Sequence, residues 1–520
     1  MKKQFHKKIW IVDFGSQYTQ LITRKSRELG YSSEIITLDE CRERFDEQKR
    51  PECLVLSGGP QSVFEDTNDY GFMFKDRTLP VLGICYGMQL MGKHFGGVVE
   101  KGLIGEYGHA DIHFTPLFQV PHCPQTMSVW MSHSDHVSLV PNSFEVVMKS
   151  SNQLVAAIKH QELPIMGLQF HPEVEHSKHG KLILDYFYRD IAGLTADWTA
   201  EEMLLEAIEM VKKVGDKKVL CAFSGGVDSL VAATLAGKVL GENLHCFFVD
   251  NGLLRLQDYH HIKILQEQTY LKIEIIDAKF DFLHALKGVD DPEKKRKIIG
   301  KMFIDIFERK VKEYQEKYKI HFEYLLQGTL YPDVIESISP HIAGGKSVTI
   351  KSHHNVGGLP ERMKLKLLEP LRFLFKDEVR EMGMALGLSR QWVFRHPFPG
   401  PGLGVRILGE VNHEAIRMVQ ESDQILYEEL LEAQLYQSTW QAFTVFLPIK
   451  TVGVKGDGRA YESVICLRMV NSSDGMTANW SHFPHEFLEL VSRRITNEVK
   501  GITRVVYDIT SKPPGTIEWE

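Results

Sequence analysis

Several features that would quickly assign a protein class are missing from this 520-residue sequence. Its seven cysteines form no CxxC pair, so the usual signal for a zinc or thiol-redox site is absent, which suits a reducing compartment. Basic residues are not in excess, and the net charge of −7 argues against a dedicated nucleic-acid or anionic-membrane surface. No apolar run approaches the length of a membrane-spanning helix.

The start of the chain also lacks a secretory signal. Residues 1–8 are charged and are followed by one short apolar stretch and then Asp13, whereas a signal peptide needs a longer apolar core and a small-residue cleavage site. An apolar content of 43% and a charged content of 25% are typical of globular chains with large cores. We therefore expect a cytoplasmic protein with no membrane partner and no nucleic-acid partner.

The length predicts about three domains, and the alternation of short apolar runs with helix-like stretches predicts an α/β fold. We expect two doubly wound, largely parallel-sheet domains over residues 8–197 and 198–395, and a C-terminal α+β domain over residues 396–520. The mixed charge run 290–297 predicts a solvated helix start. The expected strands are Ile9–Asp13, Cys53–Leu56, Val81–Ile84, Ile165–Phe170, Lys218–Phe223, Leu244–Val249, Ser463–Met469 and Arg504–Ile509, and residues 414–434 are expected to be helical.

The run SGGVDS at residues 224–229 is the most informative motif. It stands between an apolar, β-prone run and a helix of small residues, and such a turn directs backbone N–H groups and a helix N-terminus at one point, where a polyphosphate can bind. The alternative is a tight turn without a ligand. The GK[ST] ending of the Walker-type loop is missing. The expected site comprises Ser224, Gly225, Gly226, Val227, Asp228, Ser229 and Leu230, together with Asp250 and Gly252 at the end of the next strand.

The motif resembles the pyrophosphate-binding loop of the N-type ATP pyrophosphatases, which cleave ATP to AMP and pyrophosphate. The resemblance implies ATP as a co-substrate. It also implies Mg²⁺ bridging the phosphate oxygens, with Asp228 as the carboxylate most suited to contact the metal.

A second candidate site lies in the first domain. The spacing Gly83-x-Cys85-x-Gly87 at a strand-to-helix turn matches a nucleophile elbow with sulfur in place of a serine hydroxyl, and the helix N-terminus favours the thiolate. Upstream, Gly58 ends another strand, and its N–H can form an oxyanion hole with that of Tyr86. Downstream, Glu173 can orient His171 as a base. The alternative for Cys85 is a buried structural cysteine. The alternative for His171 is a metal site formed with His176 and His179, but the spacing of these histidines matches no standard zinc pattern.

The order of these three motifs resembles that of the class I (triad) glutamine amidotransferases. The resemblance implies Cys85 as the nucleophile, His171 as the general base and Glu173 as its orienting partner. It further implies that Gln89 and the loop 132–135 contact the glutamine substrate. Many relatives carry glycine at the position of Ser134.

An ammonia source joined to an ATP-cleaving unit implies amination of a carbon whose oxygen adenylylation has made a leaving group. Four further motifs, at residues 328–337, 351–358, 395–404 and 511–520, resemble the glutamine-hydrolysing GMP synthetases over essentially the full length. The resemblance implies XMP as the acceptor and a homodimer formed through the C-terminal domain. The rival classes, a tRNA-thiolating enzyme and a non-catalytic sensor, fit less well, because CxxC and positive charge are missing and the triad is intact.

The same resemblance assigns the remaining candidates. Lys512, held extended by two following prolines, suits the 5′-phosphate of XMP, and Glu518 suits its base or ribose. Lys376 is a candidate phosphate contact, although an ordinary surface ion pair explains it nearly as well. The weaker candidates are Asp457 and Arg459 for XMP, and His353 and His354 for a mobile lid over the adenylate.

Overall fold

The computed structural model describes residues 7–116, 118–268, 271–338, 364–455, 458–472 and 477–520. These residues form two compact units, which meet in the sequence between Met203 and Leu204 and are called unit 1 and unit 2 below. Within the described ranges, no helix combines the length and the apolar character needed to cross a membrane. His353, His354 and Asp457 lie outside these ranges.

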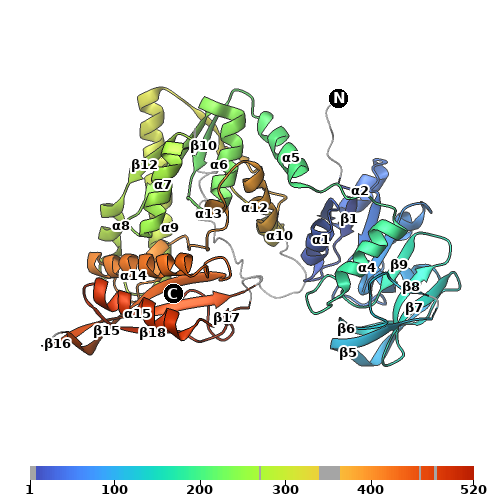
Figure 1. Ribbon diagram of the computed structural model, residues 1–520. Coiled ribbons are helices and arrows are strands. Elements are labelled where there is room, and N and C mark those ends of the chain that lie inside the picture. The colour runs from blue at the N-terminus through green and yellow to red at the C-terminus, as the bar shows by residue number, and fades with distance from the viewer. Residues whose placement is uncertain (1–6, 117, 269–270, 339–363, 456–457, 473–476) are drawn as a thin grey trace. The chain divides into compact units, whose positions relative to one another are not determined.

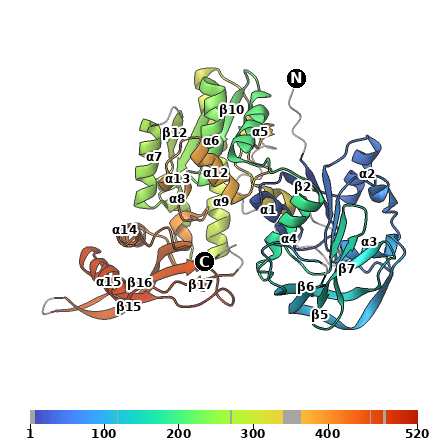
Figure 2. The same cartoon turned by 45° about the vertical axis from the view of Figure 1, so that its right-hand side comes forward.

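Unit 1 is built on a nine-stranded sheet in the order β2-β1-β3-β4-β9-β8-β7-β5-β6 (Figures 1 and 2). The first five strands of this order are parallel, and the remaining four extend the sheet in antiparallel fashion. The strands are β1 (Ile9–Val12), β2 (Ser33–Ile36), β3 (Cys53–Leu56), β4 (Val81–Ile84), β5 (Val98–Phe114), β6 (Thr126–Leu139), β7 (Phe144–Ser150), β8 (Val155–His160) and β9 (Ile165–Leu168).

Helices cover both faces of this sheet, which explains why its parallel strands are continuous apolar runs. Alternate side chains of β1 enter different cores: Ile9 packs on the face with α1 and α4, and Trp10 packs on the face with α2 and α3. The helices are α1 (Thr19–Glu28), α2 (Leu38–Asp46), α3 (Tyr86–His94) and α4 (Gly180–Tyr186), with short turns η1 (Gly71–Phe74) and η2 (Phe187–Ile191).

Unit 2 contains a five-stranded, all-parallel sheet in the order β12-β11-β10-β13-β14. Its strands are β10 (Lys218–Ala222), β11 (Leu244–Asp250), β12 (Ile273–Asp277), β13 (Phe322–Leu326) and β14 (Lys366–Leu368). Phe247 of β11 packs on the face covered by α8 and α9. The next residue, Phe248, points to the opposite face, where Ile262 of α7 lies near Gly225.

The helices that surround this sheet begin with α5, which spans the boundary between the units. They are α5 (Ala200–Lys212), α6 (Val227–Leu240), α7 (Leu256–Gln268), α8 (Lys279–Leu286), α9 (Pro292–Tyr318), α10 (Tyr331–Ile338), α12 (Lys376–Ala385) and α13 (Arg390–Val393), with short turns η3 (Gly241–Asn243) and η4 (Gly402–Val405). Thr199 caps α5 as its hydroxyl accepts from Glu202 N at 3.3 Å.

The C-terminal part of unit 2 is a smaller mixed sheet with two helices (Figure 1). Its elements are α14 (His413–Glu432), β15 (Gln441–Lys455), β16 (Gly458–Asn471), β17 (Asn479–Trp480), α15 (His485–Glu498) and β18 (Ile502–Tyr507). The apolar core that contains Leu220 of β10 continues through this part to Val491 of α15. This cluster therefore connects the parallel sheet to the C-terminal part of unit 2.

The α/β fold class is confirmed, and most predicted strands agree with the structure to within one or two residues. The prediction for the charge run 290–297 is wrong in one respect. A helix does start there, with Asp291 accepting from Lys294 N at 2.8 Å, but Lys295 is fully buried instead of solvated. Its ammonium donates to Ile407 O at 2.6 Å and pairs with Glu520 at 2.5 Å, so a carboxylate and a carbonyl replace water around the charge.

Candidate functional sites

Cys85 occupies the sharp turn between β4 and α3. Its φ of +52° lies in a region that side chains rarely adopt, so the surrounding structure must hold it there. The flanking glycines have no room for a side chain: a Cβ at Gly83 would lie 2.7 Å from Gly87 O, and one at Gly87 would lie 2.3 Å from Leu56 O. This close packing presents Cys85 at the carboxyl end of β4, beside the N-terminus of α3.

His171 and Glu173 follow β9, the neighbour of β4 in the sheet. His171 Nδ1 donates to Glu173 Oε1 at 2.8 Å, and the two side chains are 4% and 0% exposed. Burial alone would lower the pKa of His171, but Glu173 and Cys85 outweigh burial and raise that pKa to about 10. At neutral pH the imidazole is therefore protonated, and its positive charge is compensated by Glu173 and by sulfur.

Gly58 follows β3, the other neighbour of β4, so three adjacent strands bring Gly58, Cys85 and His171 together. A Cβ at Gly58 would lie 3.1 Å from His171 Cε1. Within the described part of the chain, the backbone N–H groups of Gly58 and Tyr86 have no hydrogen-bond acceptor. Both groups are available to an anionic oxygen near the sulfur.

The segment 132–135, expected to be a loop, lies within strand β6 instead. It is nevertheless next to the nucleophile: Ser132 O lies 3.8 Å from Cys85 Sγ. Gln89 Nε2 donates to Asp135 O at 2.8 Å, so this side chain holds the strand. The prediction of a loop was wrong because a strand with alternate residues buried pairs along its length with β5.

Gln169 is a site residue that the sequence reasoning missed. It is fully buried at the end of β9, and its Nε2 lies 3.7 Å from Cys85 Sγ. Its position two residues before His171 was the only available signal. The metal alternative gains no support, because His176 packs against the Trp130 ring at 4.5 Å. In the described ranges, no group of three or more His, Cys, Asp or Glu side chains is arranged to hold a metal ion.

In unit 2, the run 224–229 spans the turn after β10 and the first turn of α6, and the small residues of α6 are buried against the sheet. Gly225 has a φ of +76°, which glycine adopts without strain. Ser224 Oγ accepts from Gly226 N at 3.3 Å and lies 2.9 Å from Ser229 Oγ. The loop is thus closed on itself at the N-terminus of a long helix, the geometry that suits a phosphate group.

Lys376, the first residue of α12, pairs with Asp228 in the first turn of α6. Its ammonium lies 2.8 and 2.6 Å from the two oxygens of Asp228. Behind the carboxylate, a Cβ at Gly328 would lie 2.9 Å from the Asp228 backbone, so β13 ends directly against the loop. The structure therefore brings together two residues that are 148 positions apart in the sequence.

Asp250 and Gly252 lie at the end of β11, the strand beside β10, as the sequence predicts. The side chain of Asp250 is already bound: it accepts from Tyr259 OH at 2.9 Å and from Gly252 N at 3.0 Å, and it pairs with Lys279 at 3.1 Å. Its carboxylate shapes the turn, which leaves backbone groups as the ones that can face a ligand.

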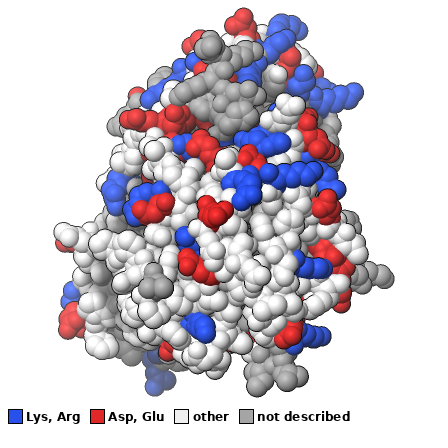
Figure 3. Space-filling view, turned by 90° about the vertical axis from the view of Figure 1, so that its right-hand side faces the viewer, with Lys and Arg blue, Asp and Glu red and all other residues white. Residues whose placement is uncertain are grey.

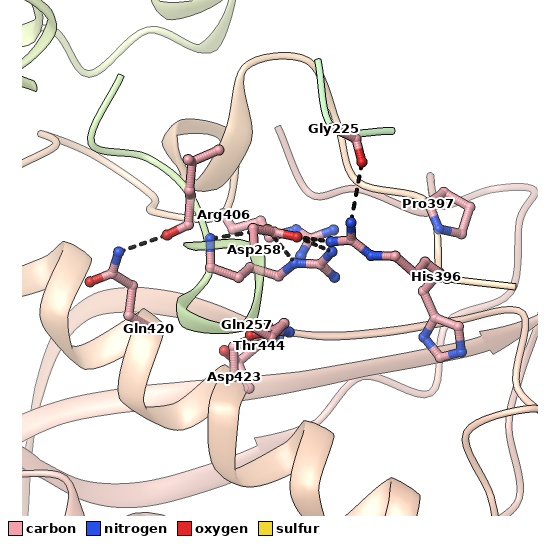
Figure 4. A network of polar contacts seen from close by, with 12 residues as sticks. Gly225, Gln257, Asp258, His396, Pro397, Arg406, Gln420, Asp423 and Thr444 are labelled. Atoms are coloured by element: carbon pink, nitrogen blue, oxygen red, sulfur yellow. Dashed lines mark hydrogen bonds and ion pairs between the residues drawn. The ribbon is translucent and has the colours of Figure 1, made fainter. Parts of the chain in front are cut away.

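A polar network connects the phosphate loop to the rest of unit 2 (Figure 4). Arg395 donates to Gly225 O at 3.2 Å and pairs with Asp258, which also binds Arg255. Burial lowers the pKa of Arg395 to about 10, so this guanidinium stays charged at neutral pH. The sequence reasoning did not assign Arg395 a role, although it stands directly before the motif HPFPGPG.

The same region ties α7 to the C-terminal part of unit 2. Gln257 Nε2 donates to Asp423 of α14 at 3.2 Å, and the other oxygen of Asp423 accepts from Thr444 N of β15 at 3.1 Å (Figure 4). The described contacts therefore run from the phosphate loop through α7 to α14 and β15. This arrangement fixes the C-terminal sheet relative to the loop.

Glu518 is held by a fully buried arginine. Arg406 donates to its two carboxylate oxygens at 3.1 and 2.9 Å, and Gln441 donates at 2.8 Å. Lys512 is extended, as expected, and pairs through its backbone with Ala478, and the residues after it form a turn. Arg459 is exposed on the β15–β16 hairpin, so the structure does not bring it to Glu518.

The surface carries both signs of charge. On the face shown in Figure 3, the Lys and Arg side chains of the described residues are interspersed with Asp and Glu side chains, and uncharged surface lies between them. Such a mixture is typical of an ordinary solvated surface and differs from the single-sign stripe of a nucleic-acid-binding face.

Three family models match successive parts of the chain: glutamine amidotransferase class-I at residues 10–191, NAD synthase at residues 200–302, and GMP synthase C terminal domain at residues 428–519. The chain is 51% identical to a protein of Nitratiruptor sp. named GMP synthase [glutamine-hydrolyzing], over 98% of this chain and 99% of that protein. A protein of the same name from Thermosipho melanesiensis is also 51% identical, over 99% of this chain and 100% of the relative. One from Chlorobium phaeovibrioides is 51% identical over 98% and 99%.

Proposed function

The chain belongs to the glutamine-hydrolysing GMP synthases, and from that premise we propose how its residues divide the reaction between two sites. The overall reaction is the amination of XMP to GMP, driven by ATP and supplied with nitrogen from glutamine. We assign glutamine hydrolysis to residues 8–197, ATP cleavage to residues 198–395, and the completion of the XMP site to residues 396–520.

In unit 1, the thiolate of Cys85 attacks the side-chain amide carbon of glutamine. The negative charge that develops on the amide oxygen is stabilised by the N–H groups of Gly58 and Tyr86. Protonated His171 gives its proton to the departing nitrogen, which leaves as ammonia, and a γ-glutamyl thioester remains on Cys85. His171, now neutral, takes a proton from water as the water attacks the thioester, and glutamate is released.

Glu173 is the group that makes this proton transfer possible at neutral pH. It holds the Nδ1 side of His171 at 2.8 Å and favours the charged ring. This leaves Nε2 as the nitrogen that exchanges a proton with sulfur, with the leaving ammonia and with water. Gln89 acts through Asp135 O and keeps strand β6 in place beside the substrate.

In unit 2, an oxygen of the xanthine ring attacks the α-phosphorus of ATP, and pyrophosphate leaves. Ammonia then attacks the ring carbon that carries this oxygen and displaces AMP, which gives GMP. The backbone N–H groups in the first turn of α6 bind the departing pyrophosphate, whereas that of Leu230 donates to Gly226 O at 3.0 Å within the helix. The ammonium of Lys376 lies 2.6 Å from Asp228 in this structure. We propose that it leaves this carboxylate and binds a phosphate oxygen of ATP.

Asp228 is the residue that we assign to Mg²⁺. Its carboxylate is partly exposed at the phosphate loop, and one or two carboxylates with phosphate oxygens form the usual Mg²⁺ site. When bound, Mg²⁺ neutralises charge on the phosphate oxygens. Release of Lys376 from Asp228 frees one carboxylate for the metal and one ammonium for the phosphate.

For XMP we propose Lys512 as the phosphate contact and Glu518 as the contact to the base or ribose. Arg406 holds Glu518 in one orientation, and Glu518 is 19% exposed at this point. Arg459 is a weaker candidate, and Asp457, His353 and His354 stay predictions, because they lie outside the described residues.

We propose that two copies associate through the C-terminal part of unit 2 and act in the cytoplasm. The β15–β16 hairpin extends from the rest of unit 2 (Figure 2) and exposes Ile449, Val452, Val454 and Tyr461. Exposed apolar side chains gathered on one hairpin favour a protein contact. Sedimentation of the full chain tests this proposal, and a monomer at micromolar concentration would contradict it.

One observation supports the assignment of unit 1 above all others: a buried His171–Glu173 pair beside a cysteine at a strained elbow. The test compares Cys85→Ala with Asp228→Ala in the full chain, with XMP, ATP and Mg²⁺ and either glutamine or ammonium. We expect C85A to lose glutamine-dependent GMP formation and to keep the ammonium-dependent reaction. D228A should lose both. Glutamine-dependent turnover in C85A would remove the triad from the mechanism, and a normal ammonium rate in D228A would remove the phosphate assignment.

A further inference from the structure

Unit 1 contains a second buried carboxylate–histidine pair, which the mechanism above does not use. Glu106 of β5 and His133 of β6 stand opposite each other in the antiparallel ladder, and their side chains are 7% and 3% exposed. Glu106 Oε2 lies 3.4 Å from His133 Nε2. A buried pair of titratable side chains is costly to desolvate, so such a pair usually holds a neighbouring part of the structure in position.

The ring of His133 acts on the strand that borders the nucleophile. Its Nδ1 lies 3.1 Å from Asp135 O, and a carbonyl oxygen only accepts, so Nδ1 carries the hydrogen. The same carbonyl accepts from Gln89 Nε2 at 2.8 Å, on the helix that directly follows Cys85. Two donors therefore hold one peptide group of the segment whose Ser132 O lies 3.8 Å from Cys85 Sγ.

Glu106 determines which nitrogen of His133 faces Asp135. When Nδ1 carries the hydrogen of a neutral ring, Nε2 of His133 and Oε2 of Glu106 face each other with lone pairs, which repel. A proton between these two atoms removes the repulsion. A proton at that contact, carried by either atom, keeps the ring in its present orientation. The other oxygen of Glu106 is anchored by Ser150 Oγ at 2.9 Å and Asn152 Nδ2 at 2.8 Å. The carboxyl group is thus fixed on one side and directs the histidine on the other.

We propose that Glu106 is a positioning residue for glutamine hydrolysis: through His133 it holds the peptide of Asp135, and so the glutamine-side strand of the Cys85 site. This inference rests on the proposed function of unit 1. Glu106 does not contact the reacting atoms, so its loss should weaken binding of glutamine more than it slows the chemical step.

The test measures KM and kcat for glutamine in the full chain, with ammonium-dependent GMP formation measured in parallel. Glu106→Leu leaves the buried Nε2 without its polar neighbour at 3.4 Å, and we expect KM for glutamine to rise about tenfold, the effect of one unpartnered buried polar group, with kcat changed by less than about twofold. Glu106→Gln should restore KM to within about twofold of the original chain. Its amide nitrogen donates to Nε2, and its oxygen still accepts from Ser150 and Asn152.

Glu100→Leu is the matched control, because Glu100 lies on the same strand opposite His136 and is exposed. It should leave KM unchanged. An unchanged KM in E106L would overturn the proposal. So would an E106Q variant as impaired as E106L, or a rise in E100L equal to that in E106L.

Alkylation of Cys85 by iodoacetamide at the original rate shows that unit 1 of E106L is folded. If labelling is lost, Asn152→Ala gives the second test, since it removes one anchor of Glu106 from an exposed turn. We expect a rise of about threefold in KM for N152A, from loss of one partly exposed hydrogen bond, and an unchanged KM would count against the proposal. Glutamine turnover in C85A would instead contradict the proposed function itself, so the two failures are distinguishable.

Discussion

Replacement of Glu173 by glutamine tests the electrostatic basis of glutamine hydrolysis. With a pKa of about 10, His171 is neutral in only about one molecule in a thousand at pH 7. Glutamine at position 173 keeps the size of the side chain but removes the charge that opposes the effect of burial. Burial then favours the neutral ring. The sulfur then loses the positive charge that stands beside it during attack, and the amide also favours the wrong tautomer of the imidazole.

We expect Glu173→Gln to reduce kcat/KM for glutamine by about 10²–10⁴-fold, the range found when an orienting carboxylate is replaced by its amide. The assay combines glutamine turnover with the pH dependence of Cys85 alkylation by iodoacetamide. In the original chain His171 stays protonated up to about pH 10, so the charge beside Cys85, and with it the alkylation rate, should change little from pH 6 to pH 9. In E173Q the rate should rise with pH, as it does for an ordinary thiol.

The matched control is Glu175→Gln, two residues further along, where the side chain is 78% exposed and pairs with Lys25. E175Q should behave as the original chain does, and ammonium-dependent synthesis should be unchanged in both variants. An E173Q variant with a flat alkylation profile and normal glutamine turnover would refute the reasoning, since the charge of Glu173 would then have no part in forming the thiolate.

Three further outcomes are expected from the same geometry. Folding raises the pKa of His171 from 6.5 to about 10. The protonated imidazole therefore contributes fully to the stability of unit 1 below pH 6.5, and this contribution is lost as the pH rises towards 10. Thermal unfolding measured over that pH range checks this. Gly87→Ala should lower the free energy of unfolding of unit 1 by more than about 3 kcal/mol, since the added methyl group would lie 2.3 Å from Leu56 O; denaturant titration checks this. Lys376→Met should reduce ammonium-dependent synthesis by about 10²-fold, the effect of losing one charged contact to the reacting phosphates, while glutamine hydrolysis by unit 1 continues; equal loss of both activities would contradict the division into two sites.

The residues of the Cys85 site could be predicted from the sequence because each of them follows a short apolar run that is typical of a parallel strand. Gly58, Cys85 and His171 follow β3, β4 and β9, which are neighbours in the sheet. Parallel strands present their carboxyl ends at one edge, so short motifs read in order were enough to place these groups together. The same logic placed the loop at residue 224 beside the turn at Asp250.

Pairs that meet across antiparallel strands left no such signal. Glu106 and His133 face each other through a register that shifts between Lys101 and Glu106, and no local spacing reveals that shift. Residues 132–135 were expected to be a loop because most side chains that alternate with the buried ones along β6 are polar. The burial of Lys295 could not be read either, because its charge is compensated by Glu520, 225 residues away.

The two kinds of residue differ in what their replacement should change, and this difference follows from how the fold holds them. Cys85, His171 and Glu173 are fixed by the ends of parallel strands, so their loss removes a chemical step and leaves the strands in place. Glu106 is fixed by side-chain contacts across a ladder, so its loss moves a binding surface and leaves the chemical groups intact. A separation of KM from kcat between E106L and E173Q is therefore the clearest sign that unit 1 uses its two carboxylate–histidine pairs differently, one for proton transfer and one for position. Equal effects of both variants on kcat would mean that a single connected network performs both tasks.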